Sequence, residues 1–184
     1  GKIFIEEPIN VFADSLTHEM TFITAPKNNL KNINQIFFDC DIEIERLISR
    51  TFTLGANLLS SEELQFGSGL INLESKKISL GLFKNLALVH SITFPLGIDH
   101  ITNDISKVCS LNFDESKLIR NNLDFIFNNP QKIVDENNFL KKNFFTSSNY
   151  RKISKNLIFD VVKARIDEML EMLKKELQIS GFNF

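Results

Sequence analysis

The 184-residue sequence has no tryptophan, one tyrosine, two cysteines and three histidines. Cys40 and Cys109 form neither a CxxC pair nor a metal-ligand spacing, so reduced thiols are expected rather than a disulfide or a zinc site. There is no recognisable signal peptide, and no apolar run is long enough to span a bilayer. The formal net charge of −2 gives no excess of positive charge, which argues against nucleic acid as a partner.

The sequence does contain enough apolar residues for a substantial core. Hydrophobic residues make up 43% of the chain, and eighteen of them are phenylalanine. A chain of this length is expected to form one domain or two small ones. His90 and His100 are isolated, and no Ser/His/Asp, Cys/His or paired-carboxylate pattern is present. We therefore predict that the chain is not an enzyme.

Residues 69–105 contain the most informative pattern in the chain. Three apolar runs (Leu70–Leu73, Ile78–Phe83 and Leu86–Phe94) are separated by short polar turns at 74–77 and 84–85. This pattern predicts a three-stranded antiparallel meander. Proline lacks the N–H that a strand needs and glycine breaks regular structure, so Pro95 and Gly97 end the third strand. A helix is predicted to follow, through Cys109.

Helical spacing of apolar residues predicts three further helices. One covers Thr51–Leu64, where Gly55 and Ala56 indicate close packing against the sheet. Another covers Asp114–Phe127, and the longest covers Arg151–Ser180 and ends at Gly181. Asn128–Asn149 is predicted to be a loop with a short strand or two.

The first fifty residues are predicted to alternate between strands and one helix. A short strand is expected at Ile3–Ile5 and another at His18–Thr24, with His18 as an ordinary strand residue. Pro26 suits the first turn of a helix that carries Leu30 and Ile33 on one face. Cys40–Leu47 is expected to be extended.

Two sequence runs carry a resemblance to a known family. Phe94–Gly97 (FPLG) and Ile101–Ile105 (ITNDI) are similar to the signature I-P-x-G-G-x-x-I-T-x-D-I of the bacterial cell-division actin FtsA. The resemblance implies an α/β (α+β) chain with an actin-like ATPase (ribonuclease H-like) fold. It also implies that residues 2–50 are the tail of a small inserted SHS2-type domain and that 51–66 are the linking helix of the first actin-like half, which leads into the hairpins. Residues 67–184 would be the second half, ending before the adenine-binding loop.

The same resemblance identifies the positions where the family binds ATP. The family's phosphate hairpin reads V-D-I-G-G-G-T-T-D. Here Asn72 stands in place of the aspartate, while Glu74, Ser75 and Lys76 replace the glycines, and Lys77, Ile78 and Ser79 follow. Gly97 belongs to the second signature. Bulky side chains and an added negative charge oppose phosphate binding in such a turn.

A second departure lies in the run Asp114–Arg120 (DESKLIR), which is similar to the family's ribose-binding helix. Lys117 stands where the family has a glutamate, and a lysine cannot accept hydrogen bonds from ribose hydroxyls. Arg120 is the other cation of this run. We therefore expect a degenerate nucleotide site and no cofactor, although ATP and Mg²⁺ are bound in the family.

Val161–Leu170 (VVKARIDEML) resembles the family run in which an arginine meets the C-terminal tail of the tubulin-like protein FtsZ. The resemblance assigns Arg165 as the partner-binding residue, and we expect it to be exposed. A guanidinium can bind a carboxylate through two parallel hydrogen bonds.

The function implied is that of an FtsA-like cell-division scaffold that binds the FtsZ C-terminal peptide and helps to tether FtsZ to the membrane. Self-association into actin-like filaments is also implied, as is a location at the cytoplasmic face of the plasma membrane at the division site. Membrane attachment would depend on a segment absent from this chain. The alternatives are a diverged actin/Hsp70-type ATPase and a homologue of the pilus-assembly actin PilM.

Overall fold

The computed structural model describes residues 5, 9–17, 20–123 and 138–182, in two compact units divided after Arg46. Among its described residues the first unit contains one helix, α1 (Lys27–Phe38), which begins directly after Pro26 as predicted. No residue of α1 is buried, and its apolar side chains at Ile33, Ile36 and Phe37 are exposed.

The predicted strands of the first unit are not observed in its described residues. Residues 20–24 and 42–47 form no strand, and residues 40–41 lie in a turn. An extended segment becomes a strand only when a neighbour pairs with its backbone groups, and no described segment of the unit does so. Ile3 and His18 lie outside the described residues. The assignment of residues 2–50 to an inserted domain stays a prediction.

The second unit begins with two short helices where one was predicted. They are α2 (Arg50–Leu58) and α3 (Ser61–Phe66). The break comes at Ser60, whose hydroxyl caps the backbone N–H of Glu63 while the Glu63 carboxylate accepts the Ser60 N–H at 2.8 Å. This reciprocal capping box starts a new helix rather than continuing the old one.

Gly55 explains how α2 packs against the sheet. A Cβ atom at this position would lie 2.0 Å from the Phe83 ring, so only glycine allows the observed contact. The prediction of close packing is therefore confirmed for Gly55. It is wrong for Ala56, which is exposed.

The predicted meander is confirmed, with strands β1 (Ser68–Leu73), β2 (Ile78–Lys84) and β3 (Ala87–Phe94) in antiparallel order β1-β2-β3. The central strand β2 is buried on both faces. Alternate side chains of a strand point to opposite faces, so Leu80 and Leu82 enter the main core. Phe83 lies against Gly55 on the other face.

Helices α4 (Ile98–Cys109), α5 (Phe113–Arg120) and α7 (Lys155–Ser180) complete the unit, with a 3-10 turn, η1, at Lys142–Phe144. Helix α5 is shorter than predicted, because residues 121–123 form a turn; residues 124–127 lie outside the described part. Helix α7 begins four residues later than predicted, after the N-cap Ser154, and ends at Gly181 with φ 66°. The described part of the predicted loop, 138–149, contains η1 and one bridge between Phe139 and Ser154.

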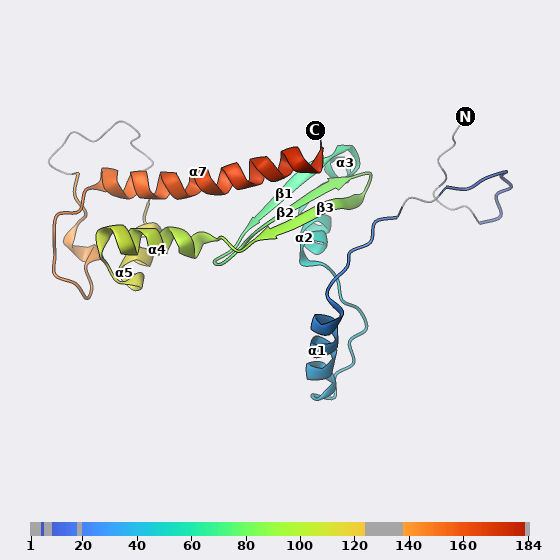
Figure 1. Cartoon of the computed structure of the whole chain (residues 1–184), viewed down its shortest axis with the longest axis horizontal. Helices are drawn as coiled ribbons and strands as arrows, with labels where there is room; N and C mark the ends of the chain where they lie inside the picture. The colour runs from blue at the N-terminus through green and yellow to red at the C-terminus, as the bar shows by residue number, and fades with distance from the viewer. Residues whose placement is uncertain (1–4, 6–8, 18–19, 124–137, 183–184) are drawn as a thin grey trace. The chain divides into compact units, whose positions relative to one another are not determined.

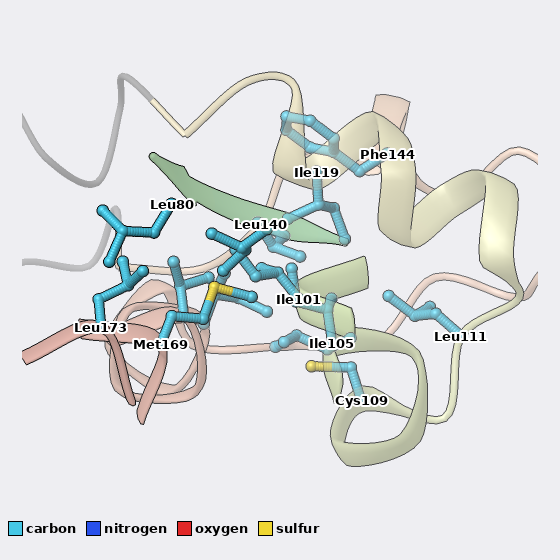
Figure 2. Close-up of a cluster of buried hydrophobic side chains, with 14 of the residues drawn as sticks. Leu80, Ile101, Ile105, Cys109, Leu111, Ile119, Leu140, Phe144, Met169 and Leu173 are labelled. Atoms are coloured by element: carbon cyan, nitrogen blue, oxygen red, sulfur yellow. The ribbon is translucent and has the colours of Figure 1, made fainter. Parts of the chain in front are cut away.

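The main core lies between the sheet and helices α4 and α7, which run antiparallel to each other (Figure 1). The side chains that fill it come from these elements, from α5 and from the segment before η1 (Figure 2), and they include Leu80, Leu82, Ile101, Ile105, Ile119, Leu140, Ile158, Val162, Met169 and Leu173. Each well-buried large side chain contributes about 1.5–3 kcal/mol. This core fixes α4 relative to both the hairpin turn and α7.

Candidate functional site

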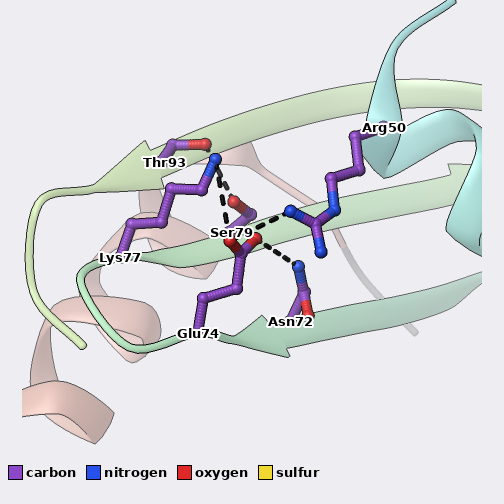
Figure 3. A network of polar contacts seen from close by, with 6 residues as sticks. All are labelled: Arg50, Asn72, Glu74, Lys77, Ser79 and Thr93. Atoms are coloured by element: carbon purple, nitrogen blue, oxygen red, sulfur yellow. Dashed lines mark hydrogen bonds and ion pairs between the residues drawn. The ribbon is translucent and has the colours of Figure 1, made fainter. Parts of the chain in front are cut away.

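The turn between β1 and β2 is organised around the carboxylate of Glu74 (Figure 3). The Asn72 side-chain amide donates to one Glu74 oxygen at 2.7 Å, and Arg50 of α2 donates to the other at 3.0 Å. The Lys77 ammonium lies 3.8 Å from the same oxygen as Arg50. Three of the residues predicted from the sequence, Asn72, Glu74 and Lys77, are thus brought together. Arg50 is an addition that no local pattern indicated.

The turn also packs directly onto the first turn of α4. The backbone N–H of Ile98 donates to the Glu74 carbonyl at 2.9 Å, and that of Asp99 donates to the Ser75 carbonyl at 2.8 Å. The first N–H groups of a helix have no partner within the helix and commonly bind anions. Here two of them are already bound by the hairpin.

Gly97 permits this close approach. A Cβ atom at Gly97 would lie 2.3 Å from the Glu74 carbonyl oxygen and 2.6 Å from the Lys77 nitrogen. The backbone φ of −146° is open to any residue, so the requirement for glycine is steric. The Gly97 N–H is itself satisfied by Nδ1 of His100 at 3.1 Å.

The remaining residues of the predicted phosphate turn have separate environments. Ser75 and Lys76 are exposed and, with Leu73, Lys77 and Ile98, line an open depression beside the turn. Ser79 is buried and pairs with Thr93 of β3, hydroxyl to hydroxyl, at 3.0 Å. Its hydroxyl therefore takes part in a cross-strand contact.

The two predicted cations of α5 differ in environment. Lys117 is exposed. Arg120 is half-buried and donates to the buried Thr102 hydroxyl at 3.0 Å, while its Nη1 lies 3.5 Å from the Asp99 carboxylate. Arg120 thus ties α5 to the first turns of α4, close to the hairpin.

Arg165 is held by two carboxylates. Its Nε donates to Asp104 of α4 at 2.5 Å, and its Nη1 donates to Glu168, one turn further along α7. The hydrogen bond to Asp104 raises the pKa of Arg165, although partial burial opposes this effect. The side chain is 21% exposed, so the expectation of an exposed arginine is wrong. Packing between α4 and α7 leaves only part of the guanidinium at the surface.

Glu115 is a buried carboxylate that the sequence reading did not single out. It lies in the first turn of α5 and has 0% exposure. Although burial would raise its pKa, hydrogen bonds from the Ser148 hydroxyl and the backbone N–H groups of Ser147 and Ser148 lower it to about 2. Glu115 therefore fixes the segment before α7 onto α5.

Two absences hold for the described part of the chain. No three His, Cys, Asp or Glu side chains there are grouped in a way that could hold a metal ion. No described helix has the length and apolar character needed to cross a bilayer.

Sequence comparison finds cell-division proteins that align along the whole chain. FtsA of Agrobacterium fabrum is 22% identical over 183 residues, which is 100% of this chain and 41% of that protein. FtsA of Bacillus subtilis is 24% identical over 181 residues, 98% of this chain and 40% of that protein. The chain thus spans about two fifths of the length of these relatives. No protein-family profile matches it.

Solved structures with the actin-like fold align with the chain. MreB 5 of Spiroplasma citri bound to AMPPNP aligns with a TM-score of 0.61 over 84% of this chain and 48% of its own, at 13% identity. The ethanolamine utilization protein EutJ from Carboxydothermus hydrogenoformans aligns with a TM-score of 0.53 over 82% of this chain and 43% of its own, at 11% identity. The predicted actin-like fold and the resemblance to FtsA are both confirmed.

Proposed function

Because the chain is a diverged relative of the cell-division protein FtsA with an actin-like fold, we propose that it belongs to a cell-division scaffold whose nucleotide site is degenerate. The observation that carries this proposal is the Glu74 carboxylate in the hairpin turn, which accepts hydrogen bonds from Asn72 and from Arg50 of α2 and lies 3.8 Å from the Lys77 ammonium. The scaffold works through protein–protein contacts rather than through ATP hydrolysis.

The contacts of the turn oppose phosphate binding. A phosphate at this turn would meet the negative charge of Glu74 and would compete with it for Arg50 and Lys77. The N–H groups of Ile98 and Asp99 already donate to hairpin carbonyls. The residues present therefore do not fit a triphosphate and its Mg²⁺. The proposed function depends on neither the nucleotide nor the metal ion.

Calorimetry with Mg-ATP tests this part of the proposal. We expect no saturable binding at micromolar concentrations, which correspond to about −8 kcal/mol of binding free energy. The measurement uses the full-length protein, because this chain spans only about two fifths of the length of its FtsA relatives. A micromolar dissociation constant would show that the Glu74 turn accommodates a nucleotide.

The proposed partner is the C-terminal peptide of FtsZ, bound at the α4–α7 surface around Arg165. Val108 lies four residues after Asp104, and Val161 lies four residues before Arg165, so each is one helical turn from the ion pair. The helices run antiparallel, with Arg151, just before α7, bonded to the end of α4 at Cys109. Both valines therefore lie on the same side of the ion pair.

The exposure of this surface suits a peptide with both acidic and apolar side chains. Val108 is 51% exposed, and Val161 is partly buried against the core. A peptide carboxylate would reach Arg165 while apolar side chains of the peptide cover the valines, in the manner of a helix lying in a groove. Membrane attachment, filament formation and a place at the division site are proposed for the whole protein.

Fluorescence anisotropy with a labelled FtsZ C-terminal peptide tests the partner. Arg165→Ala removes one charge-assisted contact, worth about 1.5–3 kcal/mol, and should therefore weaken peptide binding roughly ten- to a hundredfold. Lys174→Ala is the matched control, because it removes an exposed cation from the same helix. Circular dichroism checks that both variants are folded. Equal weakening by both substitutions, or none by Arg165→Ala, would contradict the proposed site.

A further inference from the structure

The two carboxylates that hold Arg165 differ in how firmly they are fixed. Asp104 belongs to another helix, and its side chain is 23% exposed. Its neighbours Ile101, Thr102 and Ile105 are buried, so α4 cannot move away without opening the core. Glu168 belongs to α7 itself, lies three residues after Arg165, and is 54% exposed. Glu168 is therefore the more open of the two to replacement from solvent.

We infer that Asp104 positions the Arg165 guanidinium while Glu168 occupies the edge that an incoming carboxylate takes over. This inference rests on the proposed peptide site. In the chain without a partner, one cation faces two anions, so the cluster carries a net negative charge and repels an acidic ligand. A ligand carboxylate that displaces Glu168 restores the same number of ion pairs. The internal carboxylate thus lowers the affinity for any ligand, but an acidic ligand replaces the ion pair that it displaces, whereas a neutral ligand does not.

The energetic difference between the two pairs supports this division of roles. A pair between residues one turn apart on a single helix, with a half-exposed carboxylate, is weak, so Glu168 can be displaced at little cost. Both pairs are charge-assisted hydrogen bonds, but the Asp104 carboxylate is less exposed and its bond joins two helices. The adjacent Lys163–Asp167 pair on α7 is neutral in sum and adds no net charge to the cluster.

Two substitutions that remove the same charge distinguish this exchange from general electrostatics. Glu168→Gln and Asp104→Asn each take one negative charge from beside Arg165. General electrostatics predicts that both tighten the binding of an acidic peptide. The exchange mechanism predicts opposite signs, because Asp104→Asn leaves the guanidinium without its positioning partner.

The experiment measures anisotropy of the labelled FtsZ C-terminal peptide with the full 184-residue chain. We expect Glu168→Gln to bind about twofold more tightly than wild type and Asp104→Asn to bind more weakly. Glu171→Gln, another exposed acid on α7, is the control and should change affinity by less than Glu168→Gln. In NMR spectra, saturation with peptide should leave the Arg165 Nε–H signal in place, because its bond to Asp104 is kept.

The outcomes separate this inference from the proposed function. If Arg165→Ala weakens binding but Glu168→Gln binds no more tightly than Glu171→Gln, the exchange is wrong and the peptide site stands. Tighter binding by Asp104→Asn would likewise overturn the positioning role. If wild type does not bind the peptide, or if Arg165→Ala binds as well as wild type, both the site and the exchange are wrong.

Discussion

Asp104 and Arg165 join two helices through a hydrogen bond of 2.5 Å between residues that are 61 positions apart in the sequence. One belongs to the ITNDI run of α4 and the other to the VVKARIDEML run of α7. These are two of the runs that resemble FtsA. Their shared ion pair gives a structural reason why the two runs occur in the same chain, apart from any role in partner binding.

A double-mutant cycle should detect this coupling in stability. Arg165→Ala leaves Asp104 without its cation, and Asp104→Asn leaves Arg165 with only Glu168. We expect each single substitution to lower the free energy of unfolding, and the double variant to lose less than the sum, with a coupling of about 1–2 kcal/mol. Urea unfolding followed by circular dichroism measures all four proteins. Additive losses would mean that the contact contributes nothing to folding.

The sheet and the long helix could be predicted because their information is local. Alternating apolar residues and short polar turns are sufficient for the meander, and a stripe at helical spacing is sufficient for α7. The sequence also contained the signal for the break at Ser60, which is the capping-box pattern of Ser60 followed three residues later by Glu63. Apolar residues at helical spacing on both sides of Ser60 favoured one continuous helix instead.

The contacts that shape the site could not be predicted, because they connect distant residues. Glu115 binds Ser148 across a separation of 33 residues, and Arg50 reaches Glu74 across 24. Nothing in the run around Glu115 distinguishes a buried carboxylate from a solvated one. The predicted exposure of Arg165 was wrong for the same reason, since its partner Asp104 lies on another helix.

Glu115 should make the stability of the chain sensitive to acid. Its pKa is about 2 in the folded chain and near 4.5 otherwise, so the unfolded state binds a proton first as the pH falls. The stabilisation is complete above about pH 4.5 and is lost as the pH falls toward 2. Glu115→Gln should cost on the order of 2 kcal/mol at neutral pH, because the donors of Ser147 and Ser148 lose their charged acceptor.

Urea unfolding at a series of pH values compares Glu115→Gln with Asp114→Asn. Asp114 is the adjacent acid in the same helical turn and is exposed, so its substitution should change stability by only a few tenths of a kcal/mol. As the pH falls, the free energy of unfolding of Glu115→Gln should approach that of wild type, because wild type loses the Glu115 stabilisation. Asp114→Asn should stay close to wild type at every pH. An acid-induced loss in Glu115→Gln as large as that in wild type would show that other carboxylates are responsible.

Ser60 should matter more than its neighbour Ser61. Ser60→Ala removes the side-chain acceptor for the Glu63 N–H and half of the capping box, and is expected to cost about 1 kcal/mol. Ser61→Ala changes an exposed residue within the first turn of α3 and should have almost no effect. Thermal unfolding of the two alanine variants provides the comparison, and equal melting temperatures would contradict the cap.

Gly97→Ala tests whether the closed hairpin turn depends on contact with α4. The added Cβ would lie 2.3 Å from the Glu74 carbonyl oxygen and 2.6 Å from the Lys77 nitrogen, both backbone atoms that cannot rotate away. The turn must then move off α4, and the N–H groups of Ile98 and Asp99 lose their hairpin acceptors. Crowding of this kind typically costs about 1–3 kcal/mol.

Hydrogen exchange should show faster exchange at Ile98 and Asp99 in the Gly97→Ala variant, while the amides in the middle of α7 report on the rest of the fold. Unchanged protection at both positions would mean that the turn accommodates a side chain, and that Gly97 is not what brings it so close to the helix.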